Sequence, residues 1–264
     1  MPGTSPAREG AVVLLAGPGD TTDIVAHYLA ARVPRLEVVV EESPSRLRMA
    51  RRRAKRVGWP AVVGQVLFVT VALPLLRWRG RQRIEAIVAD AELVTSPYPG
   101  THHVRSVNGQ DTVRLLRTIQ PTVIVVNGTR IISSQILDAM DCPFINTHAG
   151  ITPRYRGVHG GYWALAEGRP EMVGTTVHLV DEGIDTGGVL DRATFETSLD
   201  DSVATYPYLH LVAGLPLLAD QVGRILAGEK PSPLAEEIPP DGTRLYLHPT
   251  LWEYVRRRIR KGVR

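Results

Sequence analysis

Cysteines, secretory signals and repeats are scarce or missing in this sequence. Its 264 residues include one cysteine, Cys142, which excludes an internal disulfide framework and a multi-cysteine zinc site and favours a reducing, cytoplasmic setting. The first ten residues have no basic start followed by an apolar core, so we expect no secretory signal there. Repeats, heptads and low-complexity tracts are also absent. A chain of this length with 44% hydrophobic residues is expected to bury a sizeable globular core.

Acidic residues are missing from two stretches of the chain. Residues 44–83 hold eleven Lys or Arg and no acid, and residues 254–264 hold six more. The remainder has 14 basic against 27 acidic residues, so the pI near 9.4 reflects two basic segments on an acidic body. The basic tail has no aromatic stacking surface and matches no nucleic-acid-binding module, so we expect no nucleic-acid partner.

Short β-branched runs alternate with helical stretches, which predicts an α/β, Rossmann-like fold whose mostly parallel sheet is flanked by helices. The predicted strands are 11–16, 36–40, 92–95, 122–126, 143–148, 175–180 and 188–194. The predicted helices are 20–32, 111–119, 133–140 and about 202–226. We expect one domain over residues 1–230, interrupted by a helical insertion at 44–83, and a Pro-rich, basic extension over 231–264.

The first predicted strand ends in the turn Gly17-Pro18-Gly19-Asp20-Thr21-Thr22. Thr22 stands where a dinucleotide-binding turn has its third glycine, which disfavours NAD. Two interpretations stay open. The turn is either a tight strand-to-helix connection capped by Asp20 or Thr21, or a seat for a substrate phosphate on free backbone N–H groups.

Asn146 and His148 lie two residues apart at the end of a predicted strand, so their side chains share one face. The carboxyl end of a parallel strand is where open α/β sheets place their sites. An amide donor beside an imidazole suits oxyanion stabilisation and proton transfer. Downstream, glycines around Asp185 let the backbone bend and present this carboxylate to a neighbouring strand end. Each of the three residues also has a purely structural explanation as a cap, a core histidine or a turn residue.

Two motifs together resemble the folate-dependent formyltransferase family, which includes glycinamide ribonucleotide transformylases, methionyl-tRNA formyltransferases and sugar N-formyltransferases. The first is Asn146-Thr147-His148 followed by Arg156-Gly157. The second is Gly174-Thr175-Thr176-Val177-His178 followed by Asp185-Thr186-Gly187. The order and spacing of the two motifs are similar to those of the family over roughly residues 90–195.

The resemblance implies an enzyme of the formyltransferase fold that moves a formyl group from 10-formyltetrahydrofolate to a primary amine, without a metal. It implies that Asn146 stabilises the oxyanion, that His148, kept protonated by Asp185, is a second donor, and that Asp185 helps to remove the amine proton. The residues assigned to the folate are Asn127, Gly128, Thr129, Arg130, Ile131, His178, Val180, Asp181 and Gly183. The residues assigned to the acceptor are Gly17, Gly19, Arg154, Arg156 and Gly157.

The acceptor amine is the less defined half of the prediction. We expect a small phosphorylated acceptor, with a nucleotide-linked amino sugar first, a lipid-linked or membrane-proximal amine second and glycinamide ribonucleotide third. A tRNA acceptor is disfavoured, because too little chain follows residue 200 for the C-terminal domain of methionyl-tRNA formyltransferases. Ala149-Gly150 stands where many relatives have Pro-Ser, so the acceptor side departs from the family. The alternative from another class is a non-catalytic protein that binds folate or nucleotide.

The insertion combines a basic run, residues 46–56, with twenty uncharged residues from Val57 to Leu76. Pro60 and Pro74 are expected to limit an unbroken helix to about 14 residues, or ~21 Å, which is short of a ~30 Å hydrocarbon core. Two interpretations remain: a helix docked on its own core or in a homodimer, and peripheral attachment to an anionic bilayer at the inner face of the membrane. Trp59 and Trp78 flank the apolar stretch as interfacial anchors do.

Overall fold

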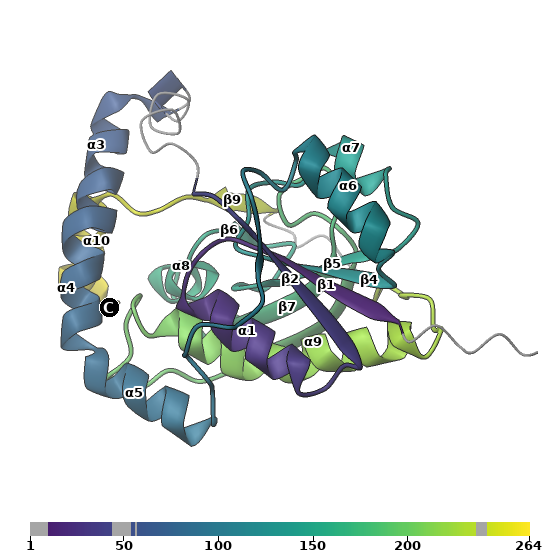
Figure 1. The fold of residues 1–264 in the computed structure, drawn as a ribbon. Helices are drawn as coiled ribbons and strands as arrows, with labels where there is room; N and C mark the ends of the chain where they lie inside the picture. Colours follow the sequence, from purple (N-terminus) through teal and green to yellow (C-terminus); the bar gives the residue numbers. More distant parts are fainter. Residues whose placement is uncertain (1–9, 44–53, 56, 236–241) are drawn as a thin grey trace, which may run out of the picture.

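The computed structural model describes residues 10–43, 54–55, 57–235 and 242–264 and contains a seven-stranded sheet. Its strand order is β3-β2-β1-β4-β5-β7-β8 (Figure 1). The strands are β1 (Ala11–Ala16), β2 (Arg35–Glu41), β3 (His102–Val104), β4 (Val123–Asn127), β5 (Phe144–His148), β7 (Gly174–Leu179) and β8 (Val189–Thr194). The first five run parallel, and β7 and β8 are antiparallel to their neighbours. The mostly parallel α/β sheet predicted from the sequence is thereby confirmed.

One predicted strand, 92–95, is wrong. These residues follow helix α5 (Arg81–Asp90), and Glu92 takes a positive φ of 52° that ends the helix and turns the chain. Leu93 packs against the core from this turn rather than from a ladder. The third strand of the sheet is instead β3, ten residues later, which pairs with β2.

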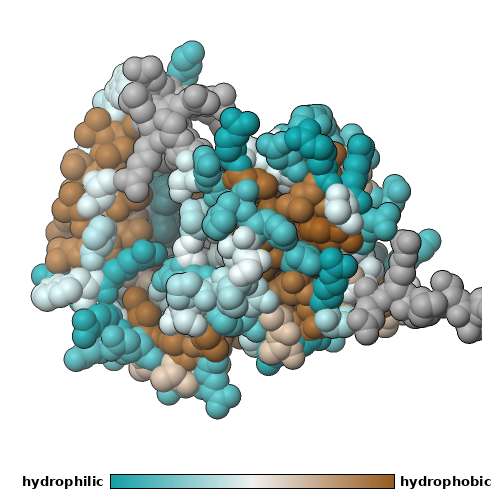
Figure 2. Space-filling model, viewed as in Figure 1, coloured by the Kyte–Doolittle hydropathy of each residue, from teal (hydrophilic) through white to brown (hydrophobic). Residues whose placement is uncertain are grey.

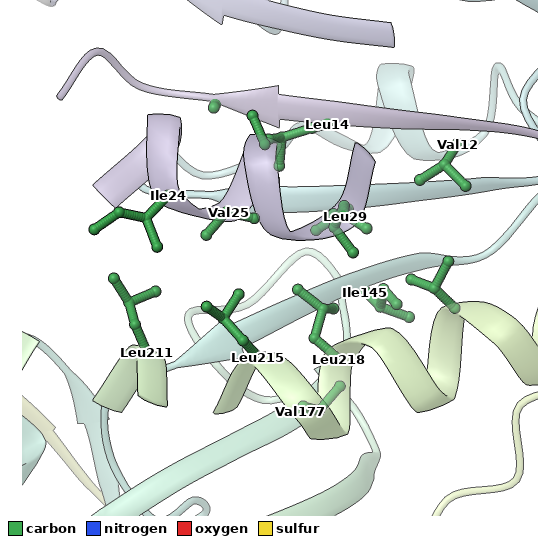
Figure 3. Packing of buried hydrophobic residues seen from close by; sticks show 14 of the residues in the cluster. Val12, Leu14, Ile24, Val25, Leu29, Ile145, Val177, Leu211, Leu215 and Leu218 are labelled. Carbon is green, nitrogen blue, oxygen red and sulfur yellow. The ribbon is translucent and has the colours of Figure 1, made fainter. Parts of the chain in front are cut away.

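Helices α1 (Asp20–Ala30) and α9 (Tyr206–Leu226) cover one face of the sheet (Figure 1). Figure 3 shows Ile24 and Leu29 of α1 and Leu211, Leu215 and Leu218 of α9 pointing toward one another. Helix α1 begins after Gly19, which has the N-cap position, so the prediction of Asp20 or Thr21 as the cap was wrong. Instead, the Asp20 carboxylate accepts a hydrogen bond from the Tyr208 hydroxyl of α9. The two helices are therefore held together by polar as well as apolar contacts.

Helices α6 (Gln110–Ile119) and α7 (Ser134–Leu137) cover the opposite face (Figure 1). Val113, Leu116 and Ile119 of α6 and Ile136 of α7 are buried against β1, β2 and β4. Because the central strands have helices on both sides, nearly all their side chains are buried, as their continuous apolar runs predict.

A second body of structure lies beside the sheet and has its own apolar core. It contains β6 (Tyr155–Gly157), which pairs with β9 (Arg244–Tyr246), and the helices α8 (Gly160–Ala166) and α10 (Leu251–Lys261). Tyr155, Tyr162, Phe68 and Tyr254 are buried in this core. The segment from β9 onward thus packs on the rest of the chain, while the division at residue 230 stays a prediction.

The insertion forms one helical rod from Trp59 to Arg79, 21 residues long. It consists of α3 (Trp59–Leu67), the π-helical turn η1 (Phe68–Ala72) and α4 (Leu73–Arg79). The expected limit of 14 residues was wrong. Pro60 lies in the first turn, where its missing N–H has no intrahelical partner to lose, and the wider π turn directly before Pro74 accommodates that ring.

The flanks of this rod return to the same sheet, because β2 precedes it and β3 follows it as the next strand over. One side of the rod is buried in the second core through Phe68, Ala72 and Leu76, and Val62 is buried as well. Most of the basic run at 46–56 lies outside the described residues. By length and composition, both this rod and α9 are apolar enough to cross a membrane.

Candidate active site

The candidate site lies where β5 meets β7. Asn146 and His148 alternate with Thr147 along β5, so both face the same side of the sheet. The antiparallel register sets Asn146 opposite His178 and His148 opposite Thr176. The two polar motifs predicted from the sequence, which are about thirty residues apart, are therefore adjacent in the structure.

Asn146 is oriented by His178. The Nδ1 atom of His178 lies 2.7 Å from the Leu179 carbonyl oxygen, so Nδ1 carries the proton and Nε2 is left as an acceptor. Asn146 Nδ2 lies 3.1 Å from this Nε2 and donates to it. One N–H of the amide is thereby used for positioning, and the second remains to donate to a bound molecule.

His148 is buried, with both ring nitrogens facing oxygen atoms. Its Nε2 lies 2.7 Å from the Tyr155 carbonyl oxygen, and its Nδ1 lies 3.3 Å from Oδ2 of Asp185. Only the doubly protonated ring can donate to both acceptors. Burial lowers the pKa of His148 below its ordinary value, and the Asp185 carboxylate and the Tyr155 carbonyl offset only part of that effect. The charge on this ring consequently depends on Asp185.

Asp185 lies between the two histidines. It adopts a φ of 51°, inside the Gly-rich loop between β7 and β8, which turns its carboxylate back toward the strand ends. Oδ2 accepts a hydrogen bond from the Gly157 N–H at 2.8 Å, and Oδ1 lies 3.7 Å from Nε2 of His178. Burial alone would raise the pKa of Asp185, but the neighbouring His148 ring and the Gly157 N–H act against burial, and this pKa is lowered. The carboxylate is ionised at neutral pH.

Asn146, His148, His178 and Asp185 line one pocket of about 880 Å³. Of the residues predicted to hold the folate, Gly128, Thr129, Arg130, Ile131, Val180, Asp181 and Gly183 also line it. The guanidinium of Arg130 is turned away to Glu41, and the Arg130 N–H donates to the same carboxylate at 2.7 Å. The loop after β4 therefore offers mainly backbone groups and apolar side chains to the pocket.

Several predicted binding residues lie elsewhere. Gly157 lines the pocket, whereas Gly17, Gly19, Asn127, Arg154 and Arg156 do not. The Gly17 N–H donates to the Asn127 carbonyl at 3.0 Å, and a Cβ on Gly17 would come within 2.4 Å of the Gly128 carbonyl oxygen. Gly17 thus allows two strand ends to approach closely. Arg154 is buried and forms an ion pair with Glu167 at 3.4 Å. Their predicted role in acceptor binding stays a prediction.

The pocket residues that sequence reasoning missed include Val57, Leu245, Tyr246 and Leu247. The last three belong to β9 or follow it, and β9 reaches the site by pairing with β6. A three-residue strand in a polar, Pro-rich stretch has no periodicity to detect. Val57 lies just before the helical rod, within the insertion.

Gly150 explains one departure from the family motif. A Cβ at this position would lie 2.6 Å from the Tyr155 carbonyl oxygen and 2.9 Å from Nε2 of His148. It would also crowd the Cα of Gly160 at 3.1 Å. Gly150 therefore lets the Tyr155 carbonyl reach the His148 ring.

Comparisons with known sequences identify the family of this chain. A family model described as formyl transferase matches residues 36–208, more than half of the chain. A methionyl-tRNA formyltransferase of Clostridium novyi is 35% identical over 121 residues, covering 44% of this chain and 38% of that protein. One from Anaeromyxobacter sp. is 30% identical over 175 residues, covering 60% and 56%. The matches thus span only about half or less of these relatives' length.

Solved structures share the fold. A sugar N-formyltransferase from Shewanella sp. FDAARGOS_354 superposes with a TM-score of 0.54 at 14% identity, covering 87% of this chain and 75% of that one. Glycinamide ribonucleotide transformylase 1 from Symbiobacterium toebii gives a TM-score of 0.54 at 16% identity, covering 83% and 88%. At these identities the likeness concerns the fold alone.

Proposed function

Because the chain belongs to the formyl transferase family, we propose that it transfers a formyl group from 10-formyltetrahydrofolate to a primary amine. The observation that carries this proposal is the convergence of Asn146, His148 and Asp185 on one pocket. Their catalytic roles remain part of the proposal.

The pocket suits a folate in size and lining. Its volume of about 880 Å³ falls in the range of small-molecule sites, and Val126, Ile132, Val180 and Ile184 give it apolar walls. Backbone groups of the loop at 128–131 and of the loop at 180–184 would hold the edge of a flat ring system. The donor would supply an activated formyl carbon for attack by the amine.

Each of the three residues then has a defined task. Asn146 donates its second N–H to the formyl oxygen, where negative charge develops. His148 donates a proton to the nitrogen that leaves, and it carries that proton only while Asp185 is ionised beside it. Asp185, directly or through water, accepts the proton that the amine loses. His178 acts through Asn146 as a positioning residue.

For the acceptor we propose a small phosphorylated amine, with a nucleotide-linked amino sugar as the first candidate. The sugar N-formyltransferase among the solved structures supports this class, and the methionyl-tRNA formyltransferases among the relatives name another acceptor. A second candidate is an amine at a membrane surface. The position of Val57 favours it, because this residue lines the pocket and directly precedes the apolar rod.

The test measures formyl transfer from 10-formyltetrahydrofolate to a panel of amines by mass spectrometry, with nucleotide-linked amino sugars, a lipid-linked amino sugar and glycinamide ribonucleotide. We expect Asn146→Ala to lower kcat about 10²- to 10³-fold and His148→Ala and Asp185→Asn about 10²- to 10⁴-fold. The surface variants His103→Ala and Asp90→Asn are matched controls and should keep full activity. Full activity of His148→Ala would refute the assignment. Folate binding without any transfer would favour the non-catalytic alternative.

A further inference from the structure

The helical rod from Trp59 to Arg79 has an apolar side that no described residue covers. Its large exposed hydrophobic residues recur every three or four positions from Trp59 to Val66 and again from Val71 to Trp78, a spacing that follows one side of the helix. They are Trp59, Val63, Val66, Leu67, Val69, Val71, Leu75 and Trp78. Trp78 is 71% exposed and Trp59 is 58% exposed, one at each end. Figure 2 shows hydrophobic residues gathered along α3 and α4 at the left of the view.

Helix α10 extends this apolar surface. It packs against α3, where the Trp252 ring lies so close to Gly64 that a Cβ there would come within 2.3 Å of it. Trp252, Val255 and Ile259 are exposed at a spacing of three and four residues. Two helices that touch therefore both leave apolar residues in contact with solvent. We call the exposed residues of the rod and these three residues of α10 the α3–α10 face.

Cations accompany the α3–α10 face. Arg77 and Arg79 lie at the end of α4, and Arg256 and Arg260 lie on α10 among its apolar positions. All four are exposed, and none forms an ion pair with another described residue. Apolar side chains next to unpaired arginines, with tryptophans at the ends, match the requirements of the headgroup region of an anionic bilayer.

We propose that the α3–α10 face binds the surface of an anionic membrane, with the rod lying in the plane of the interface. The rod does not cross the bilayer, because its other side is buried through Phe68 and Leu76 and both of its flanks join the same sheet. A second copy of the chain is the less suitable occupant. In a symmetric dimer the patch would meet itself, bringing arginines of one copy near those of the other.

The proposal links the membrane to the candidate site. Val57 lines the pocket and Trp59 begins the rod, so the pocket borders one end of the α3–α10 face. The inference does not depend on formyl transfer, because vesicle binding is measured without any substrate.

The test is co-flotation of the full-length chain with phosphatidylcholine vesicles, with and without phosphatidylglycerol. We expect the chain to float with the phosphatidylglycerol vesicles and to be released as salt rises. The triple variant Val71→Gln, Leu75→Gln, Trp78→Gln should bind more than about tenfold more weakly. The double variant Arg77→Gln, Arg79→Gln should lose about tenfold or more on the anionic vesicles alone.

A matched triple variant exchanges exposed hydrophobic residues outside the face, namely Val94→Gln, Leu199→Gln and Val212→Gln. It should bind vesicles as the unmodified chain does. Circular dichroism and thermal melting establish that all variants are folded. The proposal is overturned if the unmodified chain stays behind when anionic vesicles float, or if the triple variant on the face floats equally well. A concentration-dependent dimer, seen by sedimentation without vesicle binding and lost in that variant, would assign the face to a second copy instead.

Discussion

Two helices of this protein have the same length and a similar apolar composition but opposite surroundings. The rod Trp59–Arg79 and α9 each have 21 residues and an internal proline. Helix α9 packs against the sheet and against α1, and its one large exposed hydrophobic residue is Val212. The rod packs on one side only and exposes eight such residues. The mean hydropathy of a helix describes its composition alone. Whether the helix is buried or exposes apolar residues depends on how many of its sides the rest of the fold covers.

The two helices also differ in how each accommodates its internal proline. Pro216 lies on the exposed side of α9, where the carbonyl that loses its intrahelical donor can meet water. Pro74 is preceded by the π turn η1, and the Thr70 hydroxyl within that turn donates to the Val66 carbonyl at 2.8 Å. Both helices continue past their proline, but only the rod changes its helical geometry to do so.

The largest expected effect is on the free energy of unfolding, and it distinguishes the buried helix α9 from the exposed rod. Leu215 of α9 is 1% exposed, so Leu215→Ala should lower the free energy of unfolding by about 2–5 kcal/mol through the cavity that it leaves. Leu75→Ala on the rod should change the free energy by less than about 0.5 kcal/mol in vesicle-free buffer. Urea unfolding followed by fluorescence measures both. Equal losses in the two variants would show that the rod is covered in solution.

The second effect is a pH dependence of stability, which is caused in part by the buried histidine of α9. Burial lowers the pKa of His210 to about 3, and burial also lowers the pKa of His159 to about 3. The unfolded chain protonates these rings near pH 6.5 and the folded chain does not, so acidification favours unfolding over the window from about pH 6.5 to 3. Each ring should contribute a slope of about 1.4 kcal/mol per pH unit.

Unfolding experiments at a series of pH values measure this slope. His210→Asn should reduce the proton uptake on unfolding by about one between pH 6 and pH 4. His103→Asn, on the exposed strand β3, is the control and should leave the slope unchanged. An unaltered slope in His210→Asn would mean that the ring is already protonated in the folded chain.

The sequence predicts the sheet centre and the strand-end site well because local signals define both. The run Ala11–Ala16 is continuously apolar and is a strand over those residues, and the Asn146-x-His148 spacing requires a shared face in any strand. Pairing between β5 and β7 then brings His178 beside Asn146. Predicting these features requires only the two-residue period of a strand and the order of the motifs along the chain.

The rest of the pocket depends on contacts that are distant in the chain. Leu245 and Tyr246 reach the pocket because β9 pairs with β6, some ninety residues upstream. In the segment 92–95, two apolar residues imitate a strand, although the positive φ of Glu92 makes the segment a helix end. The rod was predicted too short, since no local pattern shows that a π turn absorbs Pro74. In each case tertiary packing decides between local alternatives of similar energy.

The smallest expected effect concerns an ion pair between α5, the helix that follows the rod, and the segment that precedes α9. Arg83 of α5 contacts Asp201, just before α9, at 2.9 Å, and the Asp201 side chain is fully buried. Burial alone would raise the pKa of Asp201, but Arg83 and Ser198 outweigh it and lower this pKa, so the buried carboxylate is charged at neutral pH and loses its cation when Arg83 is replaced. Arg83→Ala should therefore lower the free energy of unfolding by about 1–2 kcal/mol, less than a fully buried pair because Arg83 is one-third exposed.

The matched control is Arg81→Ala, which removes an exposed pair with Glu85 and should cost less than about 0.5 kcal/mol. If both variants unfold at the same urea concentration, this ion pair adds no measurable stability, and the contrast between the two helices rests on coverage alone.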